Sequence, residues 1–142
     1  MARFVYECPL RWSDLDAYGH INNSRFLTLY EEARVALFFT GGRQRGLTSF
    51  EEGIVIARHE VDYLRPVDFG TGPDGAVRAP FVRIELWISE VRPSRFVVEY
   101  ELFDGGSLAS RARSVCVPYN LDGQHPRRLS EAERAFLDDW VV

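Results

Sequence analysis

Apolar residues recur after position 22 with the spacing of an amphipathic helix. The stripe runs at intervals of three and four positions and consists of Phe26, Leu29, Tyr30, Ala33, Ala36 and Leu37. This spacing places its members on one helix face, which has to be buried. Residues 22–24 are Asn, Asn and Ser, which are preferred N-cap residues, whereas Gly41 and Gly42 follow the stripe. We therefore predict a long helix that starts among residues 22–24 and ends near Thr40.

Elsewhere apolar and polar residues alternate, as in strands with one buried face. The alternation is clearest over 82–88 and recurs over 54–63, 95–103 and 107–117. Residues 4–12 fit a first strand, and Pro9 within it indicates an edge position or a bulge. Asp104, Gly105 and Gly106 form a tight hairpin signal. In the strand over 54–63, the alternation places on one face Val55, Ala57, His59, Val61 and Tyr63.

A short helix is predicted at the C-terminal end, through Trp140, because residues 130–133 (SEAE) form a capping box. The predicted order is thus one strand, one long helix, four strands and this last helix. Strands grouped in sequence favour an antiparallel sheet with the helix on one face, the α+β arrangement. We expect one domain over residues 1–142, built as a curled sheet of about five strands wrapped around one long helix.

Composition narrows the class of protein. The 142 residues are 46% hydrophobic and 27% charged, which is typical of a globular protein. The net charge of -4 argues against nucleic acid as a partner. Because no run approaches the ~18 apolar residues of a membrane span, we expect no membrane association. The N-terminus lacks the apolar core of a secretory signal, and Cys8 and Cys116 are too few for a disulfide framework. A soluble, cytoplasmic protein is expected.

The chemistry is concentrated just before the long helix. Asp14 and Asp16 stand one residue apart and are followed by Gly19 and His20. The loop therefore delivers two carboxylates next to a helix N-terminus, where unpaired N–H groups and the positive end of the helix dipole lie. That arrangement can hold a developing oxyanion beside a carboxylate that acts on a carbonyl group.

These residues carry a family resemblance. The block DLDAYGHINNSRF before YEEAR, with EVDYLRP downstream, resembles the HotDog-fold acyl-CoA thioesterases of the 4-hydroxybenzoyl-CoA thioesterase type. The resemblance covers residues 4–119. It implies the HotDog fold, hydrolysis of acyl-CoA or aryl-CoA thioesters to free acid and CoA, no cofactor, and a homodimer or homotetramer. One departure is the Gly- and Pro-rich connection over 71–80, which is longer than usual and changes the rim of the substrate site.

The resemblance also implies roles for individual residues. Asp16 falls at the position of the catalytic carboxylate, and the backbone N–H of Asn23 falls where the family polarises the thioester carbonyl. Glu31 falls at an acidic helix position, although with Arg34 it also fits a solvated helix face with an ion pair. Asp16 could act as a general base on water or as a nucleophile through a mixed anhydride. We assign to substrate binding Gly19, His20, Asn22, Phe26 and Tyr30.

Other interpretations remain open at this stage. Asp14, Asp16 and His20 could hold a metal ion, but three ligands in one short loop make a poor site, and we expect no metal. An enoyl-thioester hydratase or dehydratase on the same fold would need an aspartate and a histidine acting together. A non-catalytic acyl-CoA-binding module would not need the Asp16 carboxylate. His59, on an apolar strand face, is expected to be a hydrogen-bonded core residue.

Overall fold

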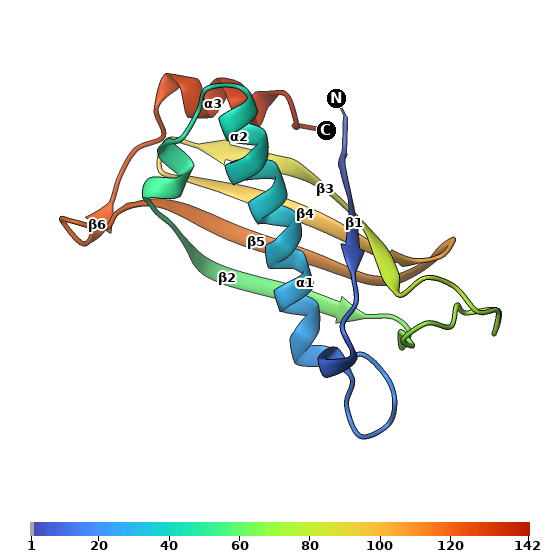
Figure 1. Cartoon of the computed structure of the whole chain (residues 1–142). Coiled ribbons are helices and arrows are strands. Elements are labelled where there is room, and N and C mark those ends of the chain that lie inside the picture. Colours follow the sequence, from blue (N-terminus) through green and yellow to red (C-terminus); the bar gives the residue numbers. More distant parts are fainter. Residues whose placement is uncertain (1) are drawn as a thin grey trace.

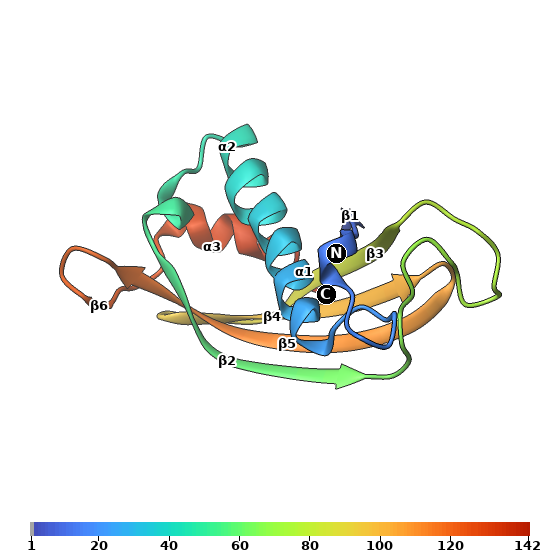
Figure 2. The same ribbon diagram turned by 60° about the horizontal axis from the view of Figure 1, so that its bottom comes forward.

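One curled antiparallel sheet wraps around a long helix in the computed structural model, which describes residues 2–142 (Figures 1 and 2). Five strands follow the order β1-β3-β4-β5-β2, and β6 pairs with β5. The strands are β1 (Phe4–Pro9), β2 (Ile54–Tyr63), β3 (Phe81–Arg92), β4 (Arg95–Asp104), β5 (Ser107–Asn120) and β6 (His125–Pro126). The predicted HotDog architecture is confirmed.

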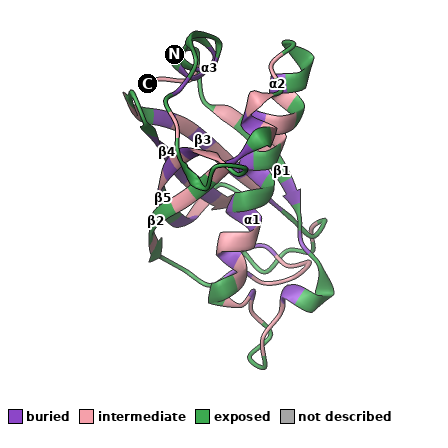
Figure 3. Cartoon of the chain, turned by 90° about the vertical axis from the view of Figure 1, so that its left-hand side faces the viewer, coloured by how far each residue is buried: buried purple, intermediate pink, exposed green. Residues whose placement is uncertain are grey.

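The long helix is built from three consecutive pieces. Helix α1 (Asn23–Val35) passes through one π-helical turn (Ala36–Thr40) into α2 (Gly41–Gln44), 22 residues in all. Its predicted apolar stripe faces the sheet, and Phe26, Tyr30 and Leu37 are almost inaccessible to solvent. Figure 3 shows the buried residues gathered where α1 and the sheet face each other. The hydrophobic stripe therefore determines which face of the helix packs against the sheet.

Several predicted element ends are wrong. The first strand ends at Pro9, and a 3-10 turn (Trp12–Asp14) follows it. The helix continues through Gly41 and Gly42 instead of ending there. A Cβ on Gly42 would lie 2.7 Å from the Leu47 carbonyl oxygen, so this glycine permits close packing rather than a stop.

The helix ends at Gln44, and Gly46 stops it two residues later. This glycine adopts φ 73°, in the left-handed region that favours glycine. The N–H of Leu47 donates to the Gly42 carbonyl at 2.8 Å, and the N–H of Gly46 donates to the Arg43 carbonyl at 3.0 Å. Together these two bonds form a Schellman motif.

Strand β2 lies at one edge of the sheet and departs from simple alternation. Its pairing with β5 shifts in register between Ile56 and Arg58, the sign of a β-bulge. The predicted common face is therefore wrong, because a bulge reverses the side on which later residues point. Before the bulge, Ile54 and Ile56 pack against the core, and after it Tyr63 stacks edge-on against Phe26.

Helix α3 (Glu131–Asp138) closes the other end of the core. The predicted capping box is present: the Ser130 hydroxyl accepts from the Glu133 N–H at 3.1 Å, and the Glu133 carboxylate accepts from the Ser130 N–H at 2.8 Å. Phe136 contacts Phe38 and Phe50, which joins the tail to the long helix. The tail is thus an integral part of the core.

Candidate active site

A tight turn presents Asp16. The turn is closed by the pairing of Leu15 with Ile21 and by a 2.8 Å bond from the Asp16 N–H to the His20 carbonyl. Gly19 adopts φ 77°, a conformation that strains other residues. Asp16 Oδ1 accepts from the N–H groups of Tyr18 at 2.9 Å and His20 at 3.3 Å. Oδ2 accepts no hydrogen bond within residues 2–142, so it remains available for chemistry.

Asp14 has a different environment. Its side chain is buried, and its oxygens accept from the Arg11 backbone N–H at 2.9 Å and from Arg11 Nη2 at 3.0 Å. Its carbonyl accepts from the Asn22 N–H at 2.8 Å. Asp14 therefore holds the turn against the helix start. Across the described chain, no three His, Cys, Asp or Glu side chains are grouped as a metal site would require.

Helix α1 starts beside this turn. Asn22 is the N-cap, and its Oδ1 accepts from the Ser24 N–H at 2.9 Å. The N–H of Asn23, the first residue of α1, donates no hydrogen bond to any described residue. The Tyr63 hydroxyl donates to the Asn23 carbonyl at 2.9 Å, so the end of β2 fixes the helix start. An unpaired N–H at the positive end of a long helix thus lies beside the Asp16 turn.

A cavity of about 390 Å³ joins these parts. Four residues assigned to the site from the sequence lie together on its wall, namely Asp16, His20, Asn23 and Phe26. The rest of the wall comes from Ile21 and from the end of β2, with Tyr63, Leu64, Arg65 and Pro66. No site role was predicted for this last segment, although it belongs to the resembling EVDYLRP block. We call this space the Asp16 cavity.

His20 is bound to a residue other than Asp16. Its Nε2 lies 3.5 Å from Asp68 Oδ1, and the backbones of the two residues form an isolated β-bridge. The His20 side chain is thereby oriented from the loop that follows β2. Among the hydrogen bonds of the described chain, the link from His20 to the Asp16 carboxylate is made by the backbone N–H.

The remaining predicted site residues lie outside the Asp16 cavity. Gly19 and Asn22 shape the turn and the helix start. Tyr30 is buried, and its hydroxyl donates to Ser110 Oγ at 2.6 Å. Glu31 lies further along α1, at a separate cavity of about 120 Å³ between the helix and β2, where its Oε2 is 3.7 Å from Arg34 Nη2.

Arg34 heads a polar network that was not predicted. A solvated helix face was one interpretation of this residue, but Arg34 is buried, and its Nη1 donates to the Tyr100 hydroxyl at 2.9 Å. The Tyr100 hydroxyl donates to Ser114 Oγ at 2.8 Å, and His59 Nδ1 lies 2.7 Å from the same oxygen. His59 is thus hydrogen-bonded as predicted, but it is exposed rather than a core residue; partial burial and the Arg34 charge lower its pKa. The spacing along the helix could have predicted the burial of Arg34, because this residue lies four positions after Tyr30 and so on the same buried face.

Comparison with known proteins identifies the family. A sequence profile of the Thioesterase-like superfamily matches residues 10–140. The chain belongs to this superfamily. A search among curated proteins found no match.

Solved structures agree with the thioesterase-like fold. A thioesterase from Thermus thermophilus, in complex with coenzyme A and Zn, is 30% identical, with a TM-score of 0.76, 96% of this chain and 92% of that chain covered. A "predicted thioesterase" from Bacillus stearothermophilus is 26% identical, with a TM-score of 0.81 and coverages of 99% and 98%. A 1,4-dihydroxy-2-naphthoyl-CoA thioesterase from Synechocystis is 18% identical, with a TM-score of 0.77 and 97% coverage of both chains, and shares the fold.

No helix in residues 2–142 of this thioesterase-like protein has both the length and the apolar composition that crossing a bilayer requires.

Proposed function

We propose that the protein hydrolyses acyl-CoA or aryl-CoA thioesters to the free acid and CoA, with Asp16 as the catalytic carboxylate. The observation that carries this proposal is the Asp16 cavity, where a carboxylate with one unpaired oxygen and the unpaired Asn23 N–H share one wall. Membership of the superfamily supports thioester hydrolysis. The coenzyme A bound to the Thermus relative supports CoA as the carrier.

The chemistry requires few groups. The Asn23 N–H, reinforced by the helix dipole, would polarise the thioester carbonyl and stabilise the oxyanion that develops on it. Asp16 Oδ2 would take a proton from water while the water oxygen attacks the carbonyl carbon. The C–S bond then breaks and CoA leaves as the thiolate, which needs little acid assistance because a cysteine-like thiol has a pKa of about 8.5. The proton taken up by Asp16 passes to the thiolate or to solvent, which restores the carboxylate. In the alternative route Oδ2 attacks the carbonyl carbon, the C–S bond breaks and CoA leaves as the thiolate, and water hydrolyses the resulting mixed anhydride, which restores the Asp16 carboxylate.

The position of His20 favours hydrolysis over hydration or dehydration. A hydratase would use an aspartate and a histidine together on neighbouring C–H and C–OH bonds. Here the His20 side chain is turned to Asp68 at 3.5 Å, whereas Asp16 is held by backbone N–H groups. The two side chains are therefore held by different partners. Analysis of the products from a saturated and an enoyl thioester separates the two reactions.

Replacing Asp16 by asparagine tests the proposal. The amide oxygen keeps the size of the turn and can still accept from Tyr18 and His20, but the negative charge is removed. We expect kcat to fall by at least ~10²-fold, the low end for losing a general base, with KM and Tm little changed. Asp122→Asn, at an exposed turn far from the cavity, is the matched control. Normal hydrolysis by the Asp16 variant would remove this residue from the mechanism, and acyl-CoA binding without turnover by the unmodified protein would indicate a non-catalytic module.

We also propose that the protein is a homodimer or a homotetramer. Strand β2 is ten residues long and lies at an open edge of the sheet, where Val55, Tyr63 and Leu64 are exposed. Such an edge is a template for pairing with a second copy. Sedimentation should show a dimer or larger species, and a folded, active monomer at low concentration would contradict this proposal.

A further inference from the structure

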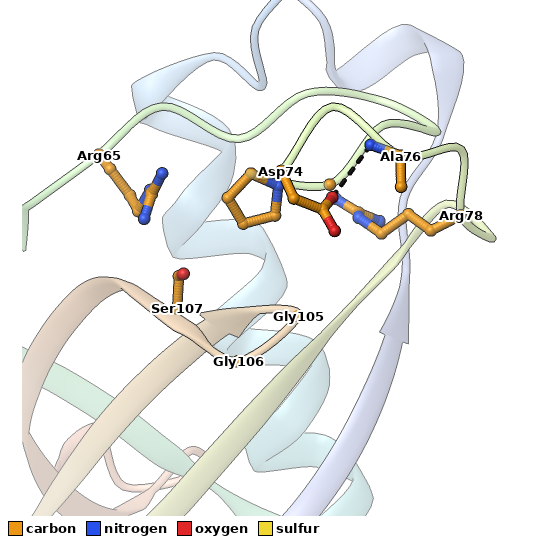
Figure 4. Close-up of a pocket in the computed structure, with 9 residues that line it drawn as sticks. Arg65, Asp74, Ala76, Arg78, Gly105, Gly106 and Ser107 are labelled. Atoms are coloured by element: carbon orange, nitrogen blue, oxygen red, sulfur yellow. Dashed lines mark hydrogen bonds between the residues drawn. The ribbon is translucent and has the colours of Figure 1, made fainter.

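A second cavity adjoins the Asp16 cavity and shares Arg65 with it. It has a volume of about 530 Å³, and three separate segments form its wall (Figure 4). These are Arg65 after β2, the β4–β5 turn with Gly105, Gly106 and Ser107, and the loop that contributes Gly72, Pro73, Asp74, Ala76 and Arg78. We call this space the turn cavity. Arg65 is the residue that the linings of the two cavities have in common.

The loop of the turn cavity is anchored to the sheet. Arg78 Nη2 is ion-paired with the buried Asp104 carboxylate and donates to the Asp68 carbonyl at 3.1 Å. Arg78 Nη1 donates to the carbonyls of Ala79 at 2.9 Å and Phe81 at 2.8 Å. The Gly- and Pro-rich connection noted in the sequence is therefore held by a buried ion pair, and it forms a fixed wall.

Several hydrogen-bond donors on the opposite wall are unpaired. The Arg65 guanidinium is exposed and makes no hydrogen bond or ion pair with any of residues 2–142, and Figure 4 shows it on the Ser107 side of the cavity. The backbone N–H groups of Gly105 and Gly106 and the Ser107 hydroxyl likewise donate to no described residue. One carboxylate, that of Asp74, borders the cavity, and its Oδ1 accepts from the Ala76 N–H at 3.0 Å. Asp74 lines the same cavity as these unpaired donors, so the cavity combines one acidic side chain with several free donors.

We propose that the turn cavity binds the phosphate groups of a CoA thioester whose acyl end occupies the Asp16 cavity. This inference rests on the proposed function and assigns the other end of the same substrate. An arginine guanidinium, backbone N–H groups of a glycine turn and a serine hydroxyl are the donors that bind phosphate in proteins. The uncharged pantetheine arm separates the thioester from the phosphates, so the two ends require neighbouring sites of different character. Arg65, at the shared wall, faces the arm and the first phosphates.

The test compares two thioesters of the same acyl group. One is the CoA thioester, and the other is the N-acetylcysteamine thioester, which has no phosphate. Arg65→Gln should lower kcat/KM for the CoA thioester at least ~10-fold more than for the N-acetylcysteamine thioester, mainly through KM, since a charged phosphate contact is lost. Any effect of Arg65 on the Asp16 cavity is common to both substrates and cancels in this ratio.

Two further variants sharpen the result. Ser107→Asp lies outside the Asp16 cavity and adds a negative charge to the turn cavity, so it should weaken the preference for CoA in the same direction. Arg128→Gln removes an exposed arginine at the opposite end of the sheet and should leave the ratio unchanged. The preference for the CoA thioester should also fall as ionic strength rises, because charges at an exposed site are screened.

The outcomes separate this inference from the proposed function. Equal losses for both thioesters in Arg65→Gln, or an unchanged ratio in Ser107→Asp, would overturn the assignment of the turn cavity and leave thioester hydrolysis intact. If the unmodified protein hydrolyses neither thioester, the proposed function fails. In that case calorimetry with coenzyme A and with pantetheine still tests whether the turn cavity binds phosphate. If Arg65→Gln and Ser107→Asp bind coenzyme A as tightly as the unmodified protein does, the assignment of the turn cavity is wrong.

Discussion

The starts of α1 and α3 use a carboxylate in opposite ways. At α3, Glu133 is buried, and its oxygens accept from Arg127, the Ser130 N–H and Ser49 at distances of 2.8 to 2.9 Å. At α1, Asp16 is only half-buried, and one of its oxygens has no partner among the described residues. The first carboxylate is saturated with hydrogen bonds, and the second is not.

The difference shows how one chemical group can serve stability or chemistry. Burial alone would raise the pKa of Glu133, but the hydrogen bonds from Arg127, Ser130 and Ser49 outweigh it and lower the pKa. Glu133 is thus charged at neutral pH and inaccessible to a substrate. Asp16 has fewer bonds and faces a cavity. We therefore assign the reaction to Asp16, whose carboxylate has an oxygen without a hydrogen-bond partner and lies at a solvent-accessible helix start.

The largest expected effect is on stability at the α3 start. Arg127→Ala leaves the Glu133 charge buried without its cation, which should lower the free energy of unfolding by roughly 3 kcal/mol and Tm by roughly 10 °C. Thermal and urea denaturation measure the loss. The pKa of Glu133 is lowered in the folded protein, so its ion pair with Arg127 stabilises the fold at pH values above 4.5, the ordinary pKa of a glutamate. This stabilisation is lost as the pH falls below that value. The difference in the free energy of unfolding between Arg127→Ala and the unmodified protein should therefore become smaller in acid. Turnover per folded molecule should stay normal.

The next effect separates the two aspartates of the α1 start. Asp14→Asn weakens the charged hydrogen bonds with Arg11, so the free energy of unfolding should fall by roughly 2 kcal/mol. Its kcat should fall less than in Asp16→Asn, because Asp14 faces Arg11 rather than the cavity. Denaturation and steady-state hydrolysis on the two variants provide the comparison. Equal losses of kcat, together with inactivation of the unmodified protein by a chelator, would instead favour a metal site.

The smallest effect concerns the α3 cap. Ser130→Ala removes the hydroxyl that accepts from the Glu133 N–H, which should cost roughly 1 kcal/mol of stability. Turnover should change little, because α3 lies far from the Asp16 cavity. A large fall in kcat with an unchanged fold would show that the tail takes part in closing the active site.

Much of the fold followed from hydrophobic spacing. The stripe from Phe26 to Leu37 predicted the buried helix face, and the capping box at Ser130 and Glu133 predicted the start of α3. The turn with Asp16 and the unpaired Asn23 N–H was also expected, because local sequence specifies an N-cap and a glycine-containing turn. These features depend on residues close together in the chain.

The rest depended on contacts between distant segments. The bulge in β2 arises from pairing with β5, and it brings His59 to Ser114 and Tyr63 to the helix start. The burial of Arg34 depends on Tyr100, 66 positions away. Arg65 could not be distinguished from other exposed arginines, because only the folded chain places it beside both cavities. Sequence spacing alone carries no information on these pairings.

The two edges of the sheet differ in their capacity to pair with further copies of the chain. Strand β1 has six residues and ends at Pro9, whereas β2 has ten residues. Short edge strands and proline discourage further pairing. Two copies joined through β2 would present only their β1 edges outward, so a continuous ribbon would stop at two subunits. The unequal edges would thus permit a closed assembly while protecting the protein against polymerisation into fibres.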